Sequence, residues 1–422
     1  MKVSVIGLGY IGLPTAALLA SCGVEVRGID TNEQLIATIN SGKAHIKENY
    51  LEDLLTGSIK NGSLFATNTI STSDVYIIAV PTPLKRNNEP DIKYIKQAIK
   101  SLASVLVKGN LIILESTSPV GTTEMIAEEL SKERRDLVFP TNNQNYPIDI
   151  NIAYCPERVI PGNTLEELVN NDRIIGGLTK DCANKAEKLY KIFVAGNVCK
   201  TTSRVAELCK LTENTFRDVN IAFSNEISMI CDNYGIDVWE LIKFANMHPR
   251  VNLLRPGSGV GGHCIAVDPW FIISDNPKTS KLITSAREVN NYKPKYILTI
   301  LEELLSEEAL SPKNTKIACF GITYKPDTDD MRESPSIEII KYLAQKDYKK
   351  IYVVDPNIDH LPENLRAQNL FLVDKDSALK DTDVVLMLVS HKEFMNISKN
   401  ELRDIKYIDT VGILKKNSKE GV

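Results

Sequence analysis

MKVSVIGLGYIGLPTAALLASCGVEVRGID, residues 1–30, is the stretch that decides the fold of this chain. Its residues fit a short buried strand, a glycine turn, a helix and a second strand that leads into an acid. These elements are expected over Val3–Ile6, Gly7–Gly12, Pro14–Ser21 and Val24–Ile29, followed by Asp30. Residues 3–24 carry no charge and also resemble a membrane span or a lipoprotein signal. We favour the first interpretation, because a continuous apolar helix tolerates so many glycines and a proline poorly.

The glycine turn is typical of a dinucleotide-binding site. Gly7 allows the tight bend, Gly9 lets the backbone approach a pyrophosphate, and Gly12 lets the helix pack on the strand. The N-terminus of the helix offers N–H groups and a positive dipole to phosphates. Asp30 follows Gly12 by 18 residues, close to the spacing of an acid that binds ribose hydroxyls. No Arg follows directly to accept a 2′-phosphate, so the pattern predicts NAD rather than NADP.

Further apolar runs continue the pattern of a parallel sheet. Val75–Val80 and Leu111–Leu114 are expected to be buried strands, and another strand and loop are expected over Ile152–Gly162. Ligands of open α/β sheets bind beyond the carboxyl ends of the strands. Thr82 and Thr117 follow the first two runs, so each is either a cofactor contact or an ordinary turn threonine.

The rest of the chain predicts a helical middle and a second α/β series. Helices are expected over Thr201–Asn233 and Pro294–Ser306, and strands over Lys316–Gly321, Ile351–Asp355, Val384–Val389 and Tyr407–Asp409. The second series again has a strand ending in Gly and a strand ending in Asp, but it lacks GxGxxG. We predict an α/β protein of two Rossmann-like, doubly wound parallel-sheet domains joined by a central helical region. The expected boundaries are 1–198 for the NAD-binding domain, 199–309 for the central region and 310–422 for the C-terminal domain.

Composition restricts the class of protein. The 422 residues are 43% hydrophobic and 25% charged, which excludes a disordered, collagen-like or disulfide-dominated chain. A net charge of −4 without a basic block argues against nucleic acid as the main partner. The eight Cys include no CxxC pair and the five His do not cluster, so we expect a reduced cytoplasmic protein without a bound metal. The long apolar helix of the middle favours a homodimer.

Polar residues recur on one side of the expected middle helix. Glu207, Lys210, Asn214 and Arg217 are spaced at i, i+3, i+7 and i+10, which places them on one face. Such a stripe is either a solvated face or, because its neighbours are strongly apolar, part of an enclosed site. In an enclosed site the pKa of Lys210 could be lowered, which would allow this residue to act as a general base.

The segment GSGVGGHCIAVD, residues 257–268, is the strongest candidate for chemistry. Its glycine density implies backbone that approaches a ligand closely. Cys264 is either a nucleophile near backbone N–H donors or a small packing residue. His263 either activates the thiol or, as we favour, caps the loop, and Asp268 could orient a water molecule. Together with NAD, a nucleophilic thiol suggests that an alcohol is oxidised past the aldehyde, through a thiohemiacetal and a thioester, to an acid.

Longer motifs run almost from end to end of the chain. They are GLGYIGLP (7–14), VPTP (80–83), ESTSPVGTT (115–123), YCPERVIPG (154–162), ELCKLTENTFRDVN (207–220), HPRVN (248–252), GVGGHCIAVDP (259–269) and GITYKPDTDDMRESP (321–335). On these motifs the chain resembles the UDP-glucose/GDP-mannose dehydrogenase family. The segments PERVIPG, KLTENTFRDVNIAF, HPRVN and GHCIAVDPWF are most similar to members that act on UDP-N-acetyl-D-mannosamine. Residues 140–150 carry no motif.

The resemblance implies roles for individual residues. Cys264 would be the nucleophile and Lys210 the principal acid/base residue, in a catalytic set of Cys264, Lys210, Asn214, Asp268, Glu157 and Thr117. NAD would be bound by Gly7, Gly9, Tyr10, Ile11, Gly12, Asp30, Thr82, Thr117 and Arg332. The substrate would be bound by Arg158, Val159, Lys210, Asn214, Arg217, His248, Arg250, Gly261, Tyr324 and Lys325. Arg250 would reach across a dimer interface, and the C-terminal domain would bind UDP.

The activity implied is that of an NAD-dependent UDP-sugar 6-dehydrogenase, which would supply a sugar acid for surface polysaccharide. Its expected partners are a UDP-sugar and a second copy of the chain, without nucleic acid or membrane. UDP-N-acetylglucosamine and UDP-glucose stay open as substrates, because sequence physics does not separate C2 epimers. Two other classes also stay open: a two-electron dehydrogenase of the hydroxyacid type, in which Cys264 is a packing residue, and a non-catalytic NAD-binding module.

Overall fold

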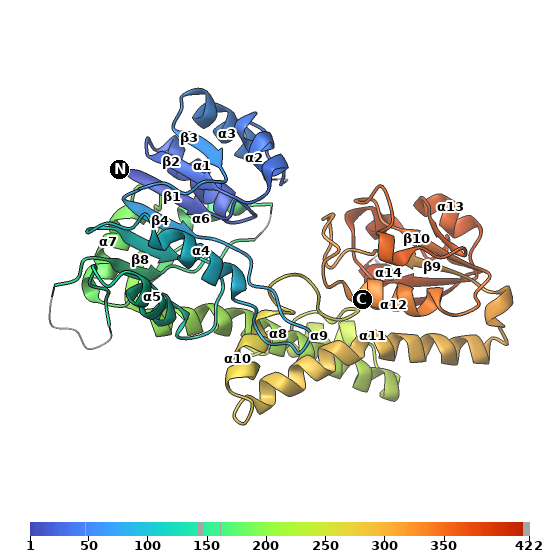
Figure 1. The fold of residues 1–422 in the computed structure, drawn as a ribbon. Helices are drawn as coiled ribbons and strands as arrows, with labels where there is room; N and C mark the ends of the chain where they lie inside the picture. The colour runs from blue at the N-terminus through green and yellow to red at the C-terminus, as the bar shows by residue number, and fades with distance from the viewer. Residues whose placement is uncertain (47, 142–146, 161, 417–422) are drawn as a thin grey trace. The chain divides into compact units, whose positions relative to one another are not determined.

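The computed structural model describes residues 1–46, 48–141, 147–160 and 162–416 (Figure 1). Residues 142–146 of the motif-free stretch, and Pro161 of the PERVIPG motif, lie outside the described residues. The chain divides into two compact units, one made of residues 1–213 and 270–275 and the other of residues 214–269 and 276–422. The division falls within one long helix, α8 (Ser203–Tyr234), so the helical middle contributes to both units.

The first unit contains the predicted parallel sheet. Among the described residues its strand order is β3-β2-β1-β4-β5-β6-β7-β8, and the one antiparallel pair is β6 with β7. The strands are β1 (Lys2–Ile6), β2 (Glu25–Ile29), β3 (Leu64–Thr67), β4 (Val75–Ile78), β5 (Leu111–Leu114), β6 (Asn151–Tyr154), β7 (Arg173–Gly177) and β8 (Val198–Thr202). The order reverses at β1, and in doubly wound sheets such a reversal marks the ligand crevice.

Helices cover both faces of this sheet. They are α1 (Gly12–Ser21), α2 (Glu33–Asn40), α3 (Leu51–Lys60), α4 (Lys93–Ala103), α5 (Thr122–Glu133), α6 (Thr164–Asn170) and α7 (Lys180–Tyr190). Val75 and Ile77 pack in one core with residues of α1, α3 and α6, whereas Tyr76 and Ile78 pack in the other core with α4 and α5. Successive side chains of a strand alternate between faces, so a strand buried on both faces needs this arrangement. The doubly wound fold class is confirmed.

The helical middle consists of α8, α9 (Val238–Ala245), α10 (Asp268–Asp275) and α11 (Lys281–Glu307). The predicted helix over Thr201–Asn233 is confirmed as α8. The prediction that a helix begins at Pro294 is wrong, because α11 carries this proline in its interior. Proline suits a helix start since it lacks an N–H, but here it lies within a helix whose residues Asn290 and Ile297, before and after the proline, are buried.

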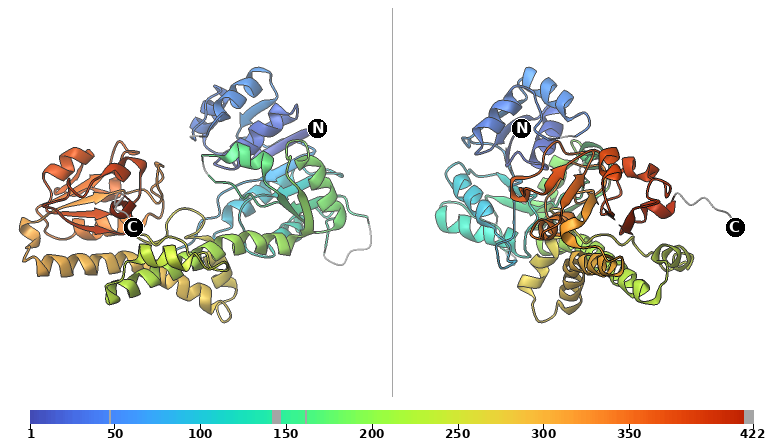
Figure 2. Two further views of the ribbon diagram at one scale, coloured as in Figure 1. Left: turned by 180° about the vertical axis from the view of Figure 1, so that it is seen from behind. Right: turned by 90° about the vertical axis from the view of Figure 1, so that its right-hand side faces the viewer.

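The second unit contains the second predicted parallel sheet (Figure 2). Its strands are β9 (Lys316–Phe320), β10 (Lys350–Val354), β11 (Leu370–Leu372), β12 (Val384–Met387) and β13 (Lys406–Asp409), in the order β11-β10-β9-β12-β13. The helices α11 and α12 (Pro335–Ala344) pack on one face, and α13 (Lys375–Lys380) and α14 (Ile413–Lys416) on the other. The order is the same as that of β3-β2-β1-β4-β5, which confirms the predicted echo of the first sheet.

Within the described ranges, none of the helices combines the length and the apolar composition that a membrane crossing needs. The uncharged stretch 3–24 instead folds as a strand, a turn and a helix that lead to β2, in agreement with the interpretation we favoured.

Candidate active site

In the glycine turn between β1 and α1, two positions have no room for a Cβ, which we call closed, and one position has room, which we call open. Gly7 has φ +91°, and a Cβ on it would lie 2.5 Å from the carbonyl oxygen of Ala79. A Cβ on Gly12 would lie 1.9 Å from the carbonyl oxygen of Gly7. At Gly9, by contrast, no described atom lies within 4 Å of the Cβ position. The fold therefore requires Gly7 and Gly12, whereas Gly9 faces open space that suits the approach of a diphosphate.

Asp30 fixes the turn from the end of β2. Its carboxylate accepts hydrogen bonds from the N–H groups of Leu8, at 3.0 Å, and Asn32, at 2.9 Å. Ile11 precedes α1 and provides no side-chain cap, so a phosphate could accept hydrogen bonds from the first N–H groups of this helix. Tyr10 is exposed on the same turn. The glycine turn, the helix start and the acid together fit NAD.

Thr82 and Thr117 lie on the loops after β4 and β5, at the carboxyl edge of the same sheet. Thr82 is buried and Thr117 is half-buried. The hydroxyl of Ser116 donates to the carbonyl oxygen of Val80 at 2.7 Å, which ties the two loops together. The first unit thus brings the predicted NAD residues to one edge, except Arg332. Arg332 belongs to the second unit, where its guanidinium donates to both carboxylate oxygens of Asp330.

Glu157 is buried in an ionic network that sequence reasoning missed. Its carboxylate accepts a hydrogen bond from the guanidinium of Arg173 at 2.7 Å, and Arg173 also lies 3.8 Å from the carboxylate of Glu115. Tyr190 donates its hydroxyl to Glu115 at 2.5 Å, and its ring centroid lies 4.3 Å from the guanidinium carbon of Arg173. Burial raises the pKa of Glu115 to about 7, although Arg173 acts in the opposite direction. Glu115 lies within the ESTSPVGTT motif, but Arg173 and Tyr190 carry no local signal.

Arg158 and Val159 follow directly on Glu157. The guanidinium of Arg158 donates to the carboxylate of Glu213 at 2.7 Å and to the carbonyl oxygen of Asp172. Val159 packs against the apolar core of the first unit. The predicted substrate residue Arg158 therefore already has two protein partners.

The first residue of the polar stripe on α8, Glu207, does not face solvent. Glu207 is fully buried and accepts hydrogen bonds from the N–H groups of Gly121 and Thr123, at 2.7 and 2.8 Å. It therefore caps the N-terminus of α5. Lys210 is half-buried in the first unit. In the second unit, Asn214 donates its side-chain amide to the carboxylate of Asp268 at 2.5 Å.

Cys264 is exposed, as are Cys22 and Cys199, whereas Cys155, Cys182, Cys231 and Cys319 are buried. An exposed position does not suit a packing residue. The carbonyl oxygen of Cys264 accepts hydrogen bonds from the N–H groups of Val267, at 3.1 Å, and Asp268, at 2.8 Å. The chain therefore turns from the cysteine straight into α10, whose first residue is Asp268. His263 beside it is exposed as well.

The glycines before Cys264 pack closely against the segment after β9. A Cβ on Gly262 would lie 2.7 Å from the ring of Tyr324, and one on Gly261 would lie 2.4 Å from the carbonyl oxygen of Glu333. The N–H of Gly262 donates to the carbonyl oxygen of Arg332 at 3.0 Å. The ammonium of Lys325 lies 5.7 Å from the Tyr324 ring centroid. Residues 257–268, which we call the thiol loop, thus form one surface with the predicted substrate residues Tyr324 and Lys325 within the second unit.

A chain of buried polar groups anchors the start of the thiol loop to α8 and α11. The N–H of Gly257 donates to the side-chain oxygen of Asn225 at 3.0 Å, and the Asn225 amide donates to Asn290 at 2.9 Å. Asn290 donates to the carboxylate of Asp218 at 2.8 Å, and Arg287 donates to the same oxygen at 2.7 Å. Buried polar groups joined in this way specify one arrangement of the loop.

The other predicted substrate residues are exposed. Arg217 lies on α8, and His248 and Arg250 lie on the segment after α9. The N–H of Arg250 donates to Nδ1 of His248 at 3.3 Å, which makes this segment a tight turn.

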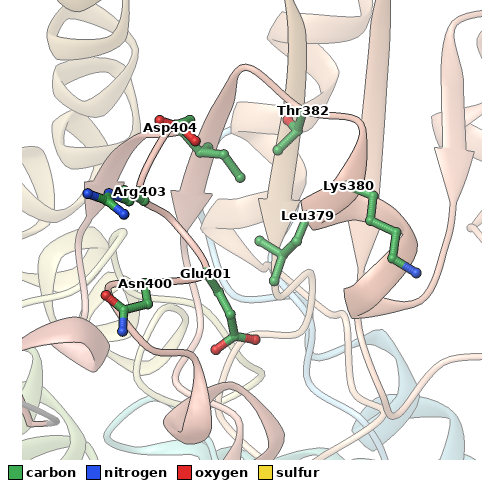
Figure 3. Close-up of a pocket in the computed structure, with 8 residues that line it drawn as sticks. Leu379, Lys380, Thr382, Asn400, Glu401, Arg403 and Asp404 are labelled. Atoms are coloured by element: carbon green, nitrogen blue, oxygen red, sulfur yellow. The ribbon is translucent and has the colours of Figure 1, made fainter.

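A separate pocket of about 280 Å³ opens in the second unit (Figure 3). Its lining includes Leu379, Thr382, Glu401 and Arg403, from the ends of the segments that lead into β12 and β13. It therefore lies at the amino edge of the sheet, whereas the thiol loop packs at the carboxyl edge. Among the described residues, no three His, Cys, Asp or Glu side chains gather as metal ligands.

Comparison with known proteins agrees with this geometry. Residues 1–194, 204–292 and 318–416 match the NAD binding, central and UDP binding domains of the UDP-glucose/GDP-mannose dehydrogenase family. The chain is 53% identical to the UDP-N-acetyl-D-mannosamine dehydrogenase of Campylobacter jejuni, over 95% of this chain and 98% of that protein. It is 50% identical to the NDP-N-acetyl-D-galactosaminuronic acid dehydrogenase of Ralstonia nicotianae, over 97% and 96%.

A solved structure is similar over the same length. The UDP-D-ManNAc dehydrogenase of Pyrococcus horikoshii is 36% identical and has a TM-score of 0.88, with 100% of this chain and 98% of that chain covered. The matches span both Rossmann-like sheets and the helical middle between them in sequence. The chain therefore belongs to the UDP-glucose/GDP-mannose dehydrogenase family and is an NAD-dependent UDP-sugar dehydrogenase.

Proposed function

We propose that this enzyme oxidises C6 of UDP-N-acetyl-D-mannosamine in two steps, through an intermediate bound to Cys264, and yields UDP-N-acetyl-D-mannosaminuronate. The observation that carries the proposal is the exposed position of Cys264 on a glycine loop that packs against Tyr324. The names of the relatives from Campylobacter jejuni and Pyrococcus horikoshii support the choice of substrate. The sugar named for the Ralstonia nicotianae relative, UDP-N-acetylglucosamine and UDP-glucose supply the alternatives. N-acetylglucosamine and glucose differ from N-acetylmannosamine at C2 alone, and N-acetylgalactosamine differs from it at C2 and C4.

The proposed chemistry assigns one task to each catalytic residue. The glycine turn and Asp30 would hold NAD, which would supply the hydride acceptor, with one NAD molecule used for each of the two oxidation steps at C6. Lys210 takes the proton of the C6 hydroxyl as a general base, which leaves an aldehyde. The thiolate of Cys264 adds to the aldehyde carbon and forms a thiohemiacetal, whose oxidation gives a thioester. Water then hydrolyses the thioester, and the acid and the thiol are released.

Two contacts suit the carboxylates of Asp268 and Glu157 to the hydrolysis step. The amide of Asn214 holds one oxygen of Asp268 at 2.5 Å, so this carboxylate keeps a fixed direction beside the turn of Cys264. Arg173 donates to the carboxylate of Glu157 at 2.7 Å and fixes its direction. In the proposal both carboxylates accept a proton from water, and Thr117 completes the catalytic set.

Basic side chains supply the charge that a diphosphate needs. Arg217, Arg250 and Lys325 are proposed to bind the UDP part, with Arg332 on NAD. The proposed boundaries stay at 1–198 for the NAD-binding domain, 199–309 for the central region and 310–422 for the UDP-binding domain. The cytoplasmic location and the place in surface polysaccharide synthesis also stay predictions.

Exposed apolar residues on α8 support the proposed homodimer. Phe216 is 66% exposed, Phe223 50% and Ile230 42%, and they follow one another every seven residues. This spacing puts them along one side of the helix, the arrangement with which two identical helices pack together. Arg250 is proposed to reach the substrate of the second copy.

A substrate panel followed by NADH absorbance tests the proposal. We expect UDP-N-acetyl-D-mannosamine to give the highest kcat/KM and two NADH for each sugar acid formed. One NADH for each product would exclude the four-electron route and favour a hydroxyacid-type dehydrogenase. NAD binding without turnover of any nucleotide sugar would leave a non-catalytic module.

A further inference from the structure

The two Rossmann-like sheets begin with the same backbone arrangement. Each first strand is followed directly by a glycine with positive φ, +91° at Gly7 and +95° at Gly321. The N–H of each glycine donates at 2.8 Å to the carbonyl oxygen of the last residue of the neighbouring strand, Ile29 in one sheet and Val354 in the other. Gly321 is therefore the counterpart of Gly7.

The acid after the second strand is repeated as well. Asp30 accepts hydrogen bonds from the N–H groups of Leu8 and Asn32, as described above. Asp355 accepts them from Ile322 at 2.9 Å and from Asn357 at 3.0 Å, the residues at the equivalent positions. Asp355 therefore occupies in the second sheet the place of the ribose-binding acid in the first.

A histidine covers this second acid. Nε2 of His391 lies 3.0 Å from the carboxylate of Asp355, and His391 is fully buried. His391 is the fourth residue after β12, as Thr82 is the fourth residue after β4, the equivalent strand. The side of Asp355 that could meet a ribose is thus filled by a side chain of the protein itself.

The contacts of His391 also fix its proton. Two donors point at Nδ1, the N–H of Asp327 and the side-chain amide of Asn357, each at 3.0 Å. Nδ1 must therefore act as an acceptor, and the single ring proton lies on Nε2 and is donated to Asp355. In this way His391 links Asp355 with Asp327, two residues beyond Lys325.

We propose that His391 is a positioning residue for the substrate loop, defined as Ile322–Asp327, which carries Tyr324 and Lys325. The inference deepens the proposed function, since it rests on these two residues binding the UDP part of the substrate. Asp355 holds the start of the loop through Ile322, and His391 holds its end through the N–H of Asp327. His391 fills the space beside Asp355 that corresponds to the proposed ribose position beside Asp30, and it fixes the loop that carries Tyr324 and Lys325.

The position of Tyr324 links the loop to the chemistry. Its ring packs against Gly262, two residues before Cys264. A substrate loop that moves would therefore lose contacts to UDP and also its fixed position against the thiol loop. His391 makes one hydrogen bond to the charged Asp355 and accepts one from the N–H of Asp327. Because these bonds fix the loop proposed to bind UDP, their loss should weaken UDP binding by roughly tenfold.

His391→Ala in the full chain tests the inference with UDP alone as the probe. We expect about tenfold weaker UDP binding by calorimetry, a similar rise in KM for the UDP-sugar, an unchanged KM for NAD and faster hydrogen exchange at the Asp327 amide. His391→Gln, which keeps a donor and an acceptor, should recover part of the affinity. Lys392→Ala is the matched control, because Lys392 contacts the carboxylate of Asp327 from an 89% exposed position.

UDP affinity and amide exchange that stay unchanged in His391→Ala would overturn the inference. If this variant does not fold, Asn357→Ala is used instead. It removes the side-chain amide that donates to Nδ1 of His391, but it keeps the hydrogen bond from the backbone N–H of residue 357 to Asp355. We then expect two- to threefold weaker UDP binding, and no change would overturn the inference. A wild type that binds UDP but yields one NADH contradicts the proposed function alone.

Discussion

The first strand of each sheet leads into a different kind of turn, although the strand order of the two sheets is the same. In the first sheet residues 7–11 separate β1 from α1, and the position beside Gly9 is open. In the second sheet residues 321–334 separate β9 from α12. Asp355, the counterpart of Asp30, is covered by His391. A short turn presents backbone N–H groups to a ligand, whereas a long turn presents side chains. One backbone plan thus suits two chemistries.

The pKa values of two buried carboxylates, one in each unit, shift in opposite directions. Burial raises the pKa of Glu115 in the first unit to about 7, because Arg173 and Tyr190 compensate for the lost water only in part. Burial also acts to raise the pKa of Asp355, but hydrogen bonds from His391 and from the N–H of Ile322 outweigh it, so this pKa is lowered. Proximity to a sheet edge does not decide the charge of an acid, but the number of donors that face it does.

Cys264→Ser is the change with the largest expected effect, and it separates the two units. Serine is a far weaker nucleophile than a thiolate at neutral pH, so we expect turnover to fall by about 10³-fold or more. NAD and UDP binding should stay within about twofold of the wild type, since serine is close to cysteine in size and leaves the backbone of the loop unchanged. Stopped-flow NADH formation and calorimetry measure the two effects. Cys199→Ser, at an exposed position on β8, is the matched control. Full activity of Cys264→Ser would remove the covalent route.

Gly9→Ala and Gly12→Ala test the open and the closed position of the first turn. A Cβ on Gly9 meets no described atom within 4 Å, so Gly9→Ala should fold normally and raise the KM for NAD by roughly tenfold or more. A Cβ on Gly12 would lie 1.9 Å from a backbone oxygen, so Gly12→Ala should lower the melting temperature instead. UDP binding should be unchanged in Gly9→Ala. An unaltered KM for NAD would show that the dinucleotide does not approach this glycine.

Local pattern was sufficient for the parts of the fold that carry long apolar runs. The strands β1, β2, β4, β5, β6, β9, β10, β12 and β13 follow from such runs, and so does α8. The strands β3, β7, β8 and β11 were missed. β11 has three residues, and β8 is largely exposed, so neither carries a buried apolar pattern. Their neighbours in the sheet, rather than their own residues, make them strands.

The residues of the candidate site also fall into those that a local motif identifies and those that it does not. Residues in contiguous motifs, such as Gly9 and Cys264, could be named from the sequence because their neighbours repeat a known pattern. Arg173, Tyr190 and His391 could not, since each acts on a partner far away in the chain. A buried ionic network is a property of the packed fold, and no spacing of residues along the chain announces it.

Glu115→Gln tests the difference between the two buried acids through the pH dependence of stability. In the unfolded chain Glu115 loses its proton near its ordinary pKa of 4.5, but in the folded chain it keeps the proton until about pH 7. Its contribution to the free energy of unfolding therefore falls between these two pH values and is constant above them. Gln cannot ionise, so from pH 5 to pH 8 the wild type should lose on the order of 2 kcal/mol more than the variant.

Urea unfolding of both proteins at the two pH values measures this difference. Glu25→Gln is a control, since Glu25 is exposed and its ion pairs are at the surface. Parallel pH profiles for the wild type and Glu115→Gln would show that Arg173 fully compensates the buried charge.

Ser116→Ala and Ser258→Ala are expected to have the smallest effects, and they compare equivalent ties at the two sheets. Ser116 donates to the carbonyl oxygen of Val80 at 2.7 Å and joins the loops that carry the proposed NAD residues Thr82 and Thr117. Ser258 donates to the carbonyl oxygen of Leu388 at 3.3 Å and joins the thiol loop to the end of β12. Each change should cost about 1 kcal/mol or less, seen as a small shift in the urea midpoint. Ser116→Ala should raise only the KM for NAD, and Ser258→Ala only the KM for the UDP-sugar, each by about twofold. Because the two hydroxyls are alike in chemistry and burial, a crossed result, with Ser258→Ala changing the KM for NAD, would show that the two turns do not act independently.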